Sequence, residues 1–278
     1  MRVWRFLPFR QCTAFENIAV DEAVFRENHR REALPTLRFY GWQSPAVSMG
    51  YFQNTFREVD VKFCRRHGID IVRRPTGGKA VLHDRDLTYA VVARGNDPLF
   101  PDDILGTYRV ISGCIAEGLS RIGIKAEIAD EERSFQDNRL KTSCFSSPSR
   151  YELLVAGRKI CGSAQVRSRG VFLQHGSILV DFDPFKTCAV MLPHHHEEEK
   201  YIEQLWRSVT SIDNHVSQPV DLTMLCDVLR KGFEKALGIR LVEQDLSPPE
   251  EELGAWLLKN KYLTDTWNMD GKAMVNEP

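Results

Sequence analysis

The sequence predicts an α+β fold with a mixed, largely antiparallel sheet flanked by helices. Strand-like and helix-like segments are interspersed, without the strict alternation of a parallel α/β protein. Residues 151–183 contain short strand-like segments separated by Ala156-Gly157 and Arg169-Gly170, which is typical of a β-meander. A chain of 278 residues that is 42% hydrophobic and 27% charged can bury a substantial core.

The first third of the chain predicts strands and helices in turn. Residues 2–7 and 36–42 have the apolar pattern of strands, and residues 15–31 between them carry apolar side chains at helical spacing. Residues 45–52 follow a turn and predict another strand. Residues 59–67 predict a helix that ends at the following glycine, a residue that commonly ends helices.

The centre of the chain predicts two strands, a helix and the meander. Residues 69–73 and 86–94 are rich in β-branched and aromatic side chains, as strands are. Residues 108–122 have an amphipathic helical pattern that ends at a glycine. Residues 131–149 are polar and irregular, so we expect a loop that leads into the meander.

Helical patterns dominate the last third of the chain. Residues 198–210 and 222–237 have helical spacing. Ser247-Pro248-Pro249-Glu250 is a capping box with proline in the first helical turn. It predicts the start of a helix that runs to about residue 261.

Charge and targeting patterns exclude several classes of protein. There are 37 Lys and Arg residues and 38 Asp and Glu residues, for a formal net charge of -1. A protein that coats nucleic acid or an anionic membrane needs an excess of basic residues, so we expect neither partner. No window approaches the roughly 18 consecutive apolar residues of a membrane span, and the first residues are too polar for a signal peptide.

The cysteines indicate a reducing compartment. There are seven, an odd number, and no CxxC pair suggests a zinc ribbon or a disulfide scaffold. We therefore expect free thiols in a cytoplasmic protein. The seven are Cys12, Cys64, Cys114, Cys144, Cys161, Cys188 and Cys226.

Three segments carry the residue types of a functional site. The first, RRPTGGKAVLH at residues 73–83, leads from two arginines through a proline to paired glycines. Glycine lets a backbone approach a ligand closely. The segment matches neither standard phosphate-loop fingerprint, and by itself it favours a tight hairpin over a site.

The second segment is residues 157–165, where three small residues at 162–164 interrupt a strand pattern. Small residues there indicate that something packs closely against the sheet. Strand alternation predicts that Lys159 and Ile160 face opposite sides, and that Cys161 shares the face of Lys159. A single lysine in a strand, taken alone, is typical of a solvated face.

The third segment, Ser143-Cys144-Phe145, ends the polar loop. A cysteine in a loop has access to a substrate, whereas a buried cysteine is usually inert. Cys114 and Cys226 lie in helical patterns and Cys64 in a basic helix, so we expect these three to be structural. Cys144 is therefore the first candidate nucleophile, and Cys161 is the second.

Together these segments resemble the octanoyltransferases of the lipoate–protein ligase type, whose fold is shared with biotin–protein ligases. The resemblance covers nearly the whole chain, and its RRPTGG and GRK–GSAQ elements are specific to this superfamily. The Cys144-Phe145 element points to the cysteine-dependent branch. Further matching segments are Phe39-Tyr40-Gly41-Trp42, Gly50-Tyr51-Phe52-Gln53, Leu87-Thr88-Tyr89, Ser149 to Glu152, Leu173-Gln174-His175-Gly176-Ser177 and Trp267-Asn268.

The resemblance implies a two-step acyl transfer that needs no cofactor, metal or ATP, because the donor thioester is already activated. Octanoyl passes from acyl carrier protein to Cys144, and then to a lysine of a lipoyl domain or of the glycine-cleavage H protein. Lys159 favours the thiolate of Cys144 and shuttles protons. The implied walls of the acyl pocket are Arg73, Arg74, Thr76, Gly77, Gly78, His83, Gly162, Ser163 and Ala164.

Three other functions fit parts of the pattern. An ATP-dependent lipoate–protein ligase shares the glycine-rich elements, but it needs no nucleophile at Cys144, and its two-domain type carries an accessory domain. An amidotransferase between lipoyl-bearing proteins also uses a cysteine. A non-catalytic lipoyl-domain binder would not need Cys144 and Lys159 together. The chain length leaves no room for the accessory domain, so we expect one catalytic domain over residues 1–278, with a core at about 32–245 and a helical tail at 246–278.

Histidines and arginines suggest further candidates. His194-His195-His196 precedes three glutamates, which favours a solvated acidic loop over a metal site. His83 and His175 are equally consistent with structural hydrogen bonds and with pocket lining. Basic residues around the cysteine loop predict a docking patch for the acidic carrier protein. They are Arg133, Arg139, Lys141, Arg150, Arg158, Arg167 and Arg169, with Arg65 and Arg66.

Overall fold

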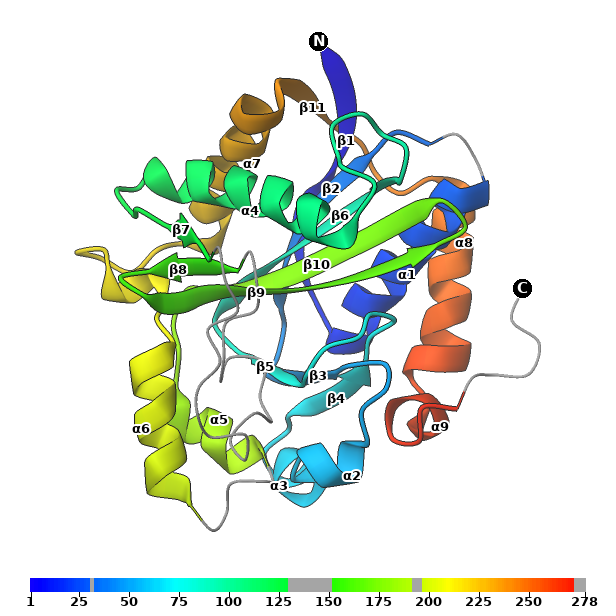
Figure 1. Ribbon diagram of the computed structural model, residues 1–278. Coiled ribbons are helices and arrows are strands. Elements are labelled where there is room, and N and C mark those ends of the chain that lie inside the picture. Colours follow the sequence, from blue (N-terminus) through cyan, green and yellow to red (C-terminus); the bar gives the residue numbers. More distant parts are fainter. Residues whose placement is uncertain (31–32, 130–151, 192–196, 273–278) are drawn as a thin grey trace.

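A large mixed sheet forms the centre of the molecule in the computed structural model, which describes residues 1–30, 33–129, 152–191 and 197–272 (Figure 1). Five of the seven strand pairs in this eight-stranded sheet are antiparallel. The predicted fold class is therefore confirmed. In spatial order the strands are β11 (Ile239–Glu243), β1 (Arg2–Cys12), β2 (Thr36–Trp42), β6 (Asp86–Arg94), β10 (Val171–Leu179), β9 (Arg158–Ser168), β8 (Leu153–Val155) and β7 (Glu127–Ile128).

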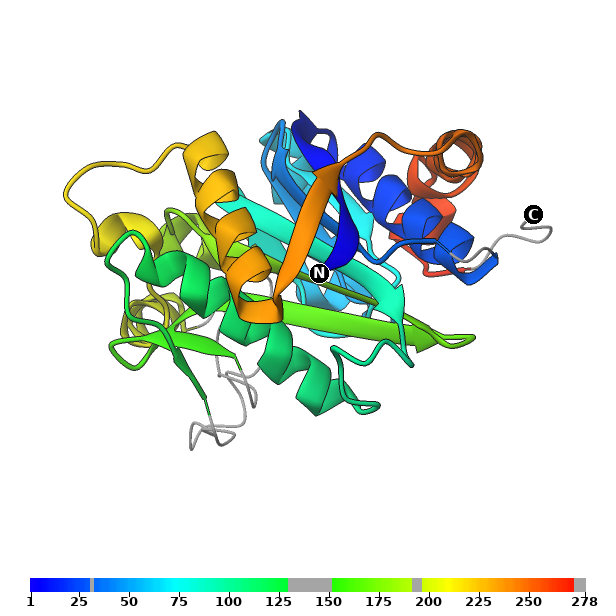
Figure 2. The ribbon, with the colours of Figure 1, turned by 90° about the horizontal axis from the view of Figure 1, so that it is seen from above.

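Helices cover both faces of this sheet (Figure 2). α4 (Ile104–Ser120) and α7 (Leu222–Leu237) pack together on one face, over one apolar core. α1 (Ala14–Arg30) and α8 (Pro248–Leu257) pack together over a second core on the other face. Trp4 of β1 is 1% exposed, so this strand contributes to the buried core.

A second, three-stranded sheet lies below α1 and the large sheet in Figure 1. Its order is β4 (Asp70–Arg73), β3 (Ala46–Met49) and β5 (Val81–His83). α2 (Thr55–Glu58) and α3 (Val61–Arg66) connect β3 to β4, and a separate apolar core stabilises this sheet. The chain leaves β4 directly into the RRPTGG segment, which is thereby held at the boundary between the two sheets.

The longest periodic patterns predicted their elements well. β2, β6 and α7 match the predicted residues. Both predicted meander turns are confirmed, because Ala156, Gly157, Arg169 and Gly170 all have positive φ, as two-residue type I′ turns require. The capping box is confirmed too: the carboxylate of Glu250 accepts hydrogen bonds from the N–H and the hydroxyl of Ser247 at 2.7 and 2.8 Å.

Boundaries and short elements depart from the sequence predictions. α4 begins at Ile104 rather than at residue 108, because the Asp103 carboxylate caps it by accepting the Gly106 N–H at 2.7 Å. β3 ends at Met49 because the chain then turns toward the RRPTGG segment. The predicted loop at 131–149 lies outside the described residues. Periodicity did not predict seven of the elements: β5, β7, β11, α2, α5 (Pro184–Val190), α9 (Asp265–Asn268) and the 3₁₀ helix η3 (Ile212–Asn214). The remaining elements are α6 (Glu198–Ser208) and the π-helix η4 (Leu258–Tyr262).

No helix within these described ranges is long and apolar enough to span a bilayer.

Candidate active site

Both sheets contribute to one pocket, which is partly open to solvent. The small sheet and the loop after it provide one wall. The large sheet and α1 provide the opposite wall. Its lining residues are Ile18, Tyr40, Trp42, Ser48, Arg74, Val81, His83, Thr88, Gly162, Ser163, Ala164, His175, Gly176 and Ser177.

The guanidinium of Arg74 organises the loop that follows β4. It is buried and donates to the carbonyl oxygens of Gly77 and Lys79, both at 2.8 Å. It also donates to the hydroxyls of Thr76 and Ser48, both at 3.1 Å. The interpretation of this segment as a plain hairpin is therefore wrong, since the loop is wrapped around a buried cation.

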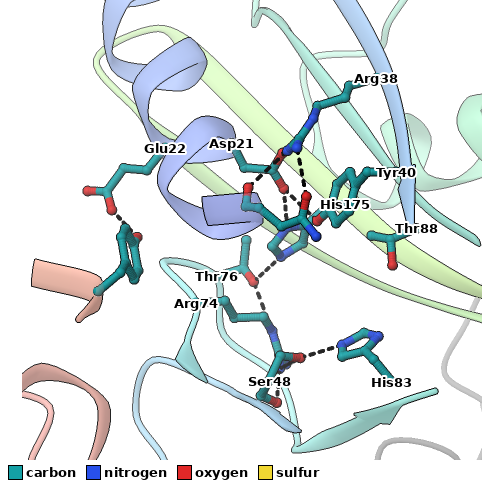
Figure 3. Close-up of polar contacts among 12 residues, drawn as sticks. Asp21, Glu22, Arg38, Tyr40, Ser48, Arg74, Thr76, His83, Thr88 and His175 are labelled. Atoms are coloured by element: carbon teal, nitrogen blue, oxygen red, sulfur yellow. Dashed lines mark hydrogen bonds and ion pairs between the residues drawn. The ribbon is translucent and has the colours of Figure 1, made fainter. Parts of the chain in front are cut away.

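Thr76 connects this arginine to a buried histidine (Figure 3). Its Oγ1 lies 2.7 Å from Nε2 of His175, and Nδ1 of His175 lies 3.1 Å from Oδ2 of Asp21. Burial lowers the pKa of His175 and the nearby Arg74 lowers it further; Asp21 raises it, but the net shift is downward, so the imidazole is neutral at pH 7. Burial raises the pKa of Asp21, but Arg38 and His175 outweigh burial, and the pKa is lowered. The ionised carboxylate thus accepts the Nδ1 proton, and Nε2 accepts the hydroxyl proton of Thr76.

Ser48 connects Arg74 to a second histidine in the same way. Its Oγ lies 2.8 Å from Nε2 of His83, and Nδ1 of His83 lies 2.9 Å from Oδ2 of Asp86. His83 also stacks on Trp42, with ring centroids 3.9 Å apart. Two histidine–carboxylate pairs therefore meet at one arginine beside the pocket. Both histidines are hydrogen-bonded and both line the pocket, so the two roles considered for them coincide.

The sequence analysis missed the carboxylates that orient these histidines. Asp21 lies on α1, whose polar side chains resemble a solvated face, but the large sheet and α8 bury them. Asp21 also accepts hydrogen bonds from Arg38 at 2.7 Å and from the hydroxyl of Tyr40 at 2.9 Å. Asn17, four residues earlier on the same helix face, accepts from Arg38 at 2.8 Å. The Asn17–Asp21 spacing is the signal that could have revealed this buried polar face.

The predicted pocket residues separate into three groups. Five of them line the pocket, and three lie in the loop wrapped around Arg74. Arg73 belongs to neither of these groups, because its guanidinium donates to the carbonyl oxygens of Gly50, Tyr51, Gln53 and Trp267. The five are Arg74, His83, Gly162, Ser163 and Ala164, and the three are Thr76, Gly77 and Gly78.

Lys159 is fully buried and forms an ion pair with Glu152, with Nζ and Oε1 2.7 Å apart. The interpretation of Lys159 as a residue on a solvated face is therefore wrong. Cys144, the predicted nucleophile, lies outside the described residues. The histidines at 194–196 also lie outside them, and within the described ranges no group of His, Cys, Asp and Glu could hold a metal ion.

A β-bulge changes which side chains share the face of Lys159. Leu154 pairs with Lys159 and Leu153 pairs with Cys161, which leaves Ile160 as the extra residue of the bulge. Paired residues share a face, whereas consecutive residues in a strand alternate. Lys159 and Ile160 lie on opposite faces, as predicted, because Ile160 packs into the core beneath α4 and α7. The prediction that Cys161 shares the face of Lys159 is wrong, because Cys161 packs into the core beneath α4 and α7.

The other cysteines fit structural roles in the described part of the chain. The six described cysteines are free thiols. Burial raises the pKa of Cys64, Cys114 and Cys226 to about 12 in each case. These thiols remain protonated near neutral pH, so the prediction that they are structural is confirmed.

The described members of the predicted basic patch do not gather at one point. Arg158 and Arg169 lie at opposite ends of β9, about 35 Å apart at the usual rise per residue of a strand. Arg167 donates to the carbonyl oxygens of residues 102 and 103, and Arg65 forms an exposed ion pair with Asp265. Arg66, next to Arg65, is the exposed last residue of α3. The other candidates, Arg133, Arg139, Lys141 and Arg150, lie outside the described residues.

Comparisons with known proteins agree with this architecture. A family model described as "Lipoyl protein ligase A/B catalytic domain" matches residues 13–234. The chain is 43% identical to "Octanoyltransferase LipM" of Kyrpidia tusciae over 96% of this chain and 99% of that protein. It is 41% identical to the protein of the same name from Symbiobacterium thermophilum over 96% and 98% of the two chains. The structure of a bi-partite lipoate protein ligase from Thermoplasma acidophilum superposes with a TM-score of 0.81 at 27% identity, covering 99% of each chain.

Proposed function

The chain belongs to the lipoyl protein ligase A/B catalytic domain family, and from this we propose that it is an octanoyltransferase of lipoate biosynthesis. The observation that carries the proposal is similarity at 41–43% identity to octanoyltransferases along almost the full length of both chains. The predicted alternatives, a ligase and an amidotransferase, have no comparable observation in their favour. The pocket between the two sheets is the proposed acyl site, and the surface that its lining presents is mostly apolar, as ligand pockets commonly are.

The chemistry has two steps, and Cys144 is the proposed nucleophile. Its thiolate attacks the thioester carbonyl of octanoyl-acyl carrier protein, and the carrier thiol leaves. The amine of an acceptor lysine then attacks the enzyme thioester, an amide forms, and Cys144 recovers its thiol with the proton that the amine loses. In this proposal the positive charge of Lys159 favours the thiolate of Cys144. Neither step needs ATP or a cofactor, because the donor thioester is already activated.

The proposed acceptor is a lipoyl domain or the glycine-cleavage H protein, and the proposed location is the cytoplasm. The whole chain acts as one catalytic domain in this proposal. The absence of a side chain at Gly176 supports the proposal that an acyl chain lies against the sheet at this point. A Cβ atom there would come within 2.5–2.8 Å of Gly162 O, the Tyr89 ring and Ser163 Oγ, so only glycine leaves the pocket wall intact.

A mass-spectrometric assay tests the nucleophile and the donor together. The enzyme is mixed with octanoyl-acyl carrier protein and digested, and the peptide that contains residue 144 is examined for an octanoyl adduct. We expect the adduct in the wild type and in Cys161→Ser, and its loss in Cys144→Ser. Loss in Cys161→Ser with retention in Cys144→Ser would reverse the assignment of the nucleophile. ATP-dependent labelling with free lipoate, without any adduct from the carrier protein, would replace the transferase by a ligase.

A further inference from the structure

The buried Glu152–Lys159 ion pair lies on the face of the large sheet that carries the pocket. The bulge at Ile160 sets Lys159 opposite Cys161, whose side chain belongs to the core beneath α4 and α7. Ala164, three residues beyond Cys161, also lies on the face opposite that core, and it lines the pocket. Lys159 and the pocket wall are therefore on the same side of β9.

The backbone around Lys159 is fixed independently of its side chain. Its carbonyl oxygen accepts the N–H of Thr210 at 2.9 Å, and it forms a parallel bridge with Val209 after α6. Leu154 pairs with it across the hairpin. The side chain therefore leaves a rigid point of the sheet, and Glu152 fixes where its ammonium group ends.

Glu152 stabilises the charge of this buried lysine. Lys159 is 0% exposed and Glu152 is 4% exposed. An ammonium group removed from water tends to give up its proton unless a counter-charge lies close to it. The Glu152 carboxylate, 2.7 Å from Nζ, supplies that counter-charge.

We propose that Glu152 is a positioning residue that keeps Lys159 protonated and fixed, so that Lys159 acts as a permanent positive charge and not as a proton shuttle. The inference rests on the proposed octanoyl transfer. In the first step the ammonium group stabilises the thiolate of Cys144. In the second step the proton lost by the attacking amine passes to the departing sulfur, so the reaction balances without a base at Lys159.

Two substitutions of Glu152 separate the effect of its charge from the effect of its size. Glu152→Gln removes the charge, and Glu152→Asp keeps it on a shorter side chain. Single-turnover octanoylation of the enzyme is measured from pH 6 to about 10 (a range that brackets ordinary thiol and lysine titration), and circular dichroism checks the fold. We expect Glu152→Gln to slow acylation at least tenfold at neutral pH, with little change in donor KM. The alkaline limb of its pH profile should move toward lower pH, because neutral Lys159 no longer stabilises the thiolate. Glu152→Asp should stay within about threefold of the wild type.

A matched control tests whether any loss of an ion-paired glutamate has this effect. Glu117 also accepts an ion pair at 2.7 Å, from Lys235, but this pair joins α4 and α7 at the surface, far from the pocket. Glu117→Gln should leave the rate and the pH profile unchanged. The double variant Glu152→Gln/Lys159→Arg should recover acylation relative to Glu152→Gln, because a guanidinium stays charged without its carboxylate.

Different results would overturn the proposed role of Glu152 and the proposed octanoyl transfer. A wild-type enzyme that forms no octanoyl adduct ends the proposed function. A wild-type enzyme that forms it, while Glu152→Gln acylates at the same rate and with the same pH profile, overturns the role of Glu152. If Glu152→Gln does not fold, the variant Lys159→Arg is used instead. Retained octanoyl transfer to the acceptor in this variant supports a fixed charge at residue 159. An octanoyl-enzyme that forms but cannot pass its acyl group to the acceptor means that Lys159 acts as a base.

Discussion

Replacing Arg73 by lysine should loosen the connection between the loop at residues 50–53 and the C-terminal segment. The guanidinium of Arg73 is 1% exposed and makes seven hydrogen bonds. Its acceptors are carbonyl oxygens of the 50–53 loop, the hydroxyl of Thr55, and carbonyl oxygens at residues 267–269. Trp267 returns a hydrogen bond from its indole N–H to the Arg73 carbonyl at 2.8 Å. One side chain therefore joins segments about 200 residues apart in sequence.

The number of donors determines the expected loss of stability. Four of the seven contacts are fully buried. An ammonium group has three donors on one nitrogen, so at least one buried acceptor must lose its partner, and more if both segments cannot be reached at once. A buried acceptor left without a donor costs about 1–3 kcal/mol, so we expect Arg73→Lys to lower the free energy of unfolding by about 2–4 kcal/mol.

Urea unfolding followed by tryptophan fluorescence and far-ultraviolet circular dichroism measures this loss. The matched control is Arg65→Lys. Arg65 also joins the α3 region to α9, through Asp265 at 3.3 Å, but both side chains are largely exposed. A surface pair contributes at most about 1 kcal/mol, so the control should unfold close to the wild type. Equal unfolding free energies for Arg73→Lys and Arg65→Lys would refute this reasoning, because they would show that the buried contacts of Arg73 contribute no more than a surface pair.

Three further predictions follow from burial and close approach. The wild type should lose stability as the pH falls below about 6.5, because the lowered pKa of buried His175 lets the unfolded state bind a proton before the folded state does. This loss is up to about 1.4 kcal/mol of unfolding free energy per pH unit, and His175→Gln should reduce it. Unfolding free energies measured from neutral to acidic pH check this, and an unchanged slope against pH in the variant contradicts it. Gly50→Ala should reduce octanoyl-enzyme formation at least tenfold, because a Cβ there collides with the backbone of the glycine-rich loop, whereas Gly113→Ala, in open space on α4, should keep full activity. Glu250→Gln should cost about 3–5 kcal/mol in thermal or urea unfolding, because it leaves a buried arginine without its carboxylate, and a loss below 1 kcal/mol would contradict that.

Local patterns predicted the elements that tertiary contacts do not alter. β2, β6 and α7 have long apolar periodicities, and both meander turns need positive φ at both positions, so local chemistry fixes them. Helix α5 was missed although Asp183 caps its start by accepting two backbone N–H groups. Seven residues are too few for periodicity to identify, and the capping residue was the available signal.

The candidate site was harder to predict, because neighbouring residues of the same type have different surroundings. Arg73 and Arg74 are adjacent and both buried, yet one holds the C-terminal segment and the other organises the pocket loop. Strand alternation gave Cys161 the wrong face, because the bulge at Ile160 depends on pairing with β8. Asp21 is oriented by Arg38 from another strand. Each of these outcomes depends on contacts between distant segments, which residue type and spacing do not encode.

The hydrogen-bond network around Arg74, His83 and His175 is compatible with the apolar acyl chain that we propose for this pocket, although many lining residues are polar. A polar group that loses water to a bound hydrocarbon is costly unless it already has a hydrogen-bond partner. Arg74 donates to Ser48 and Thr76, and both histidines are paired at both ring nitrogens. Arg38 and Asp21 form an ion pair in this network, so these opposite charges are matched within the protein. Binding of the proposed acyl chain would therefore break few existing hydrogen bonds, and the lining would act as an apolar surface although many of its residues are polar.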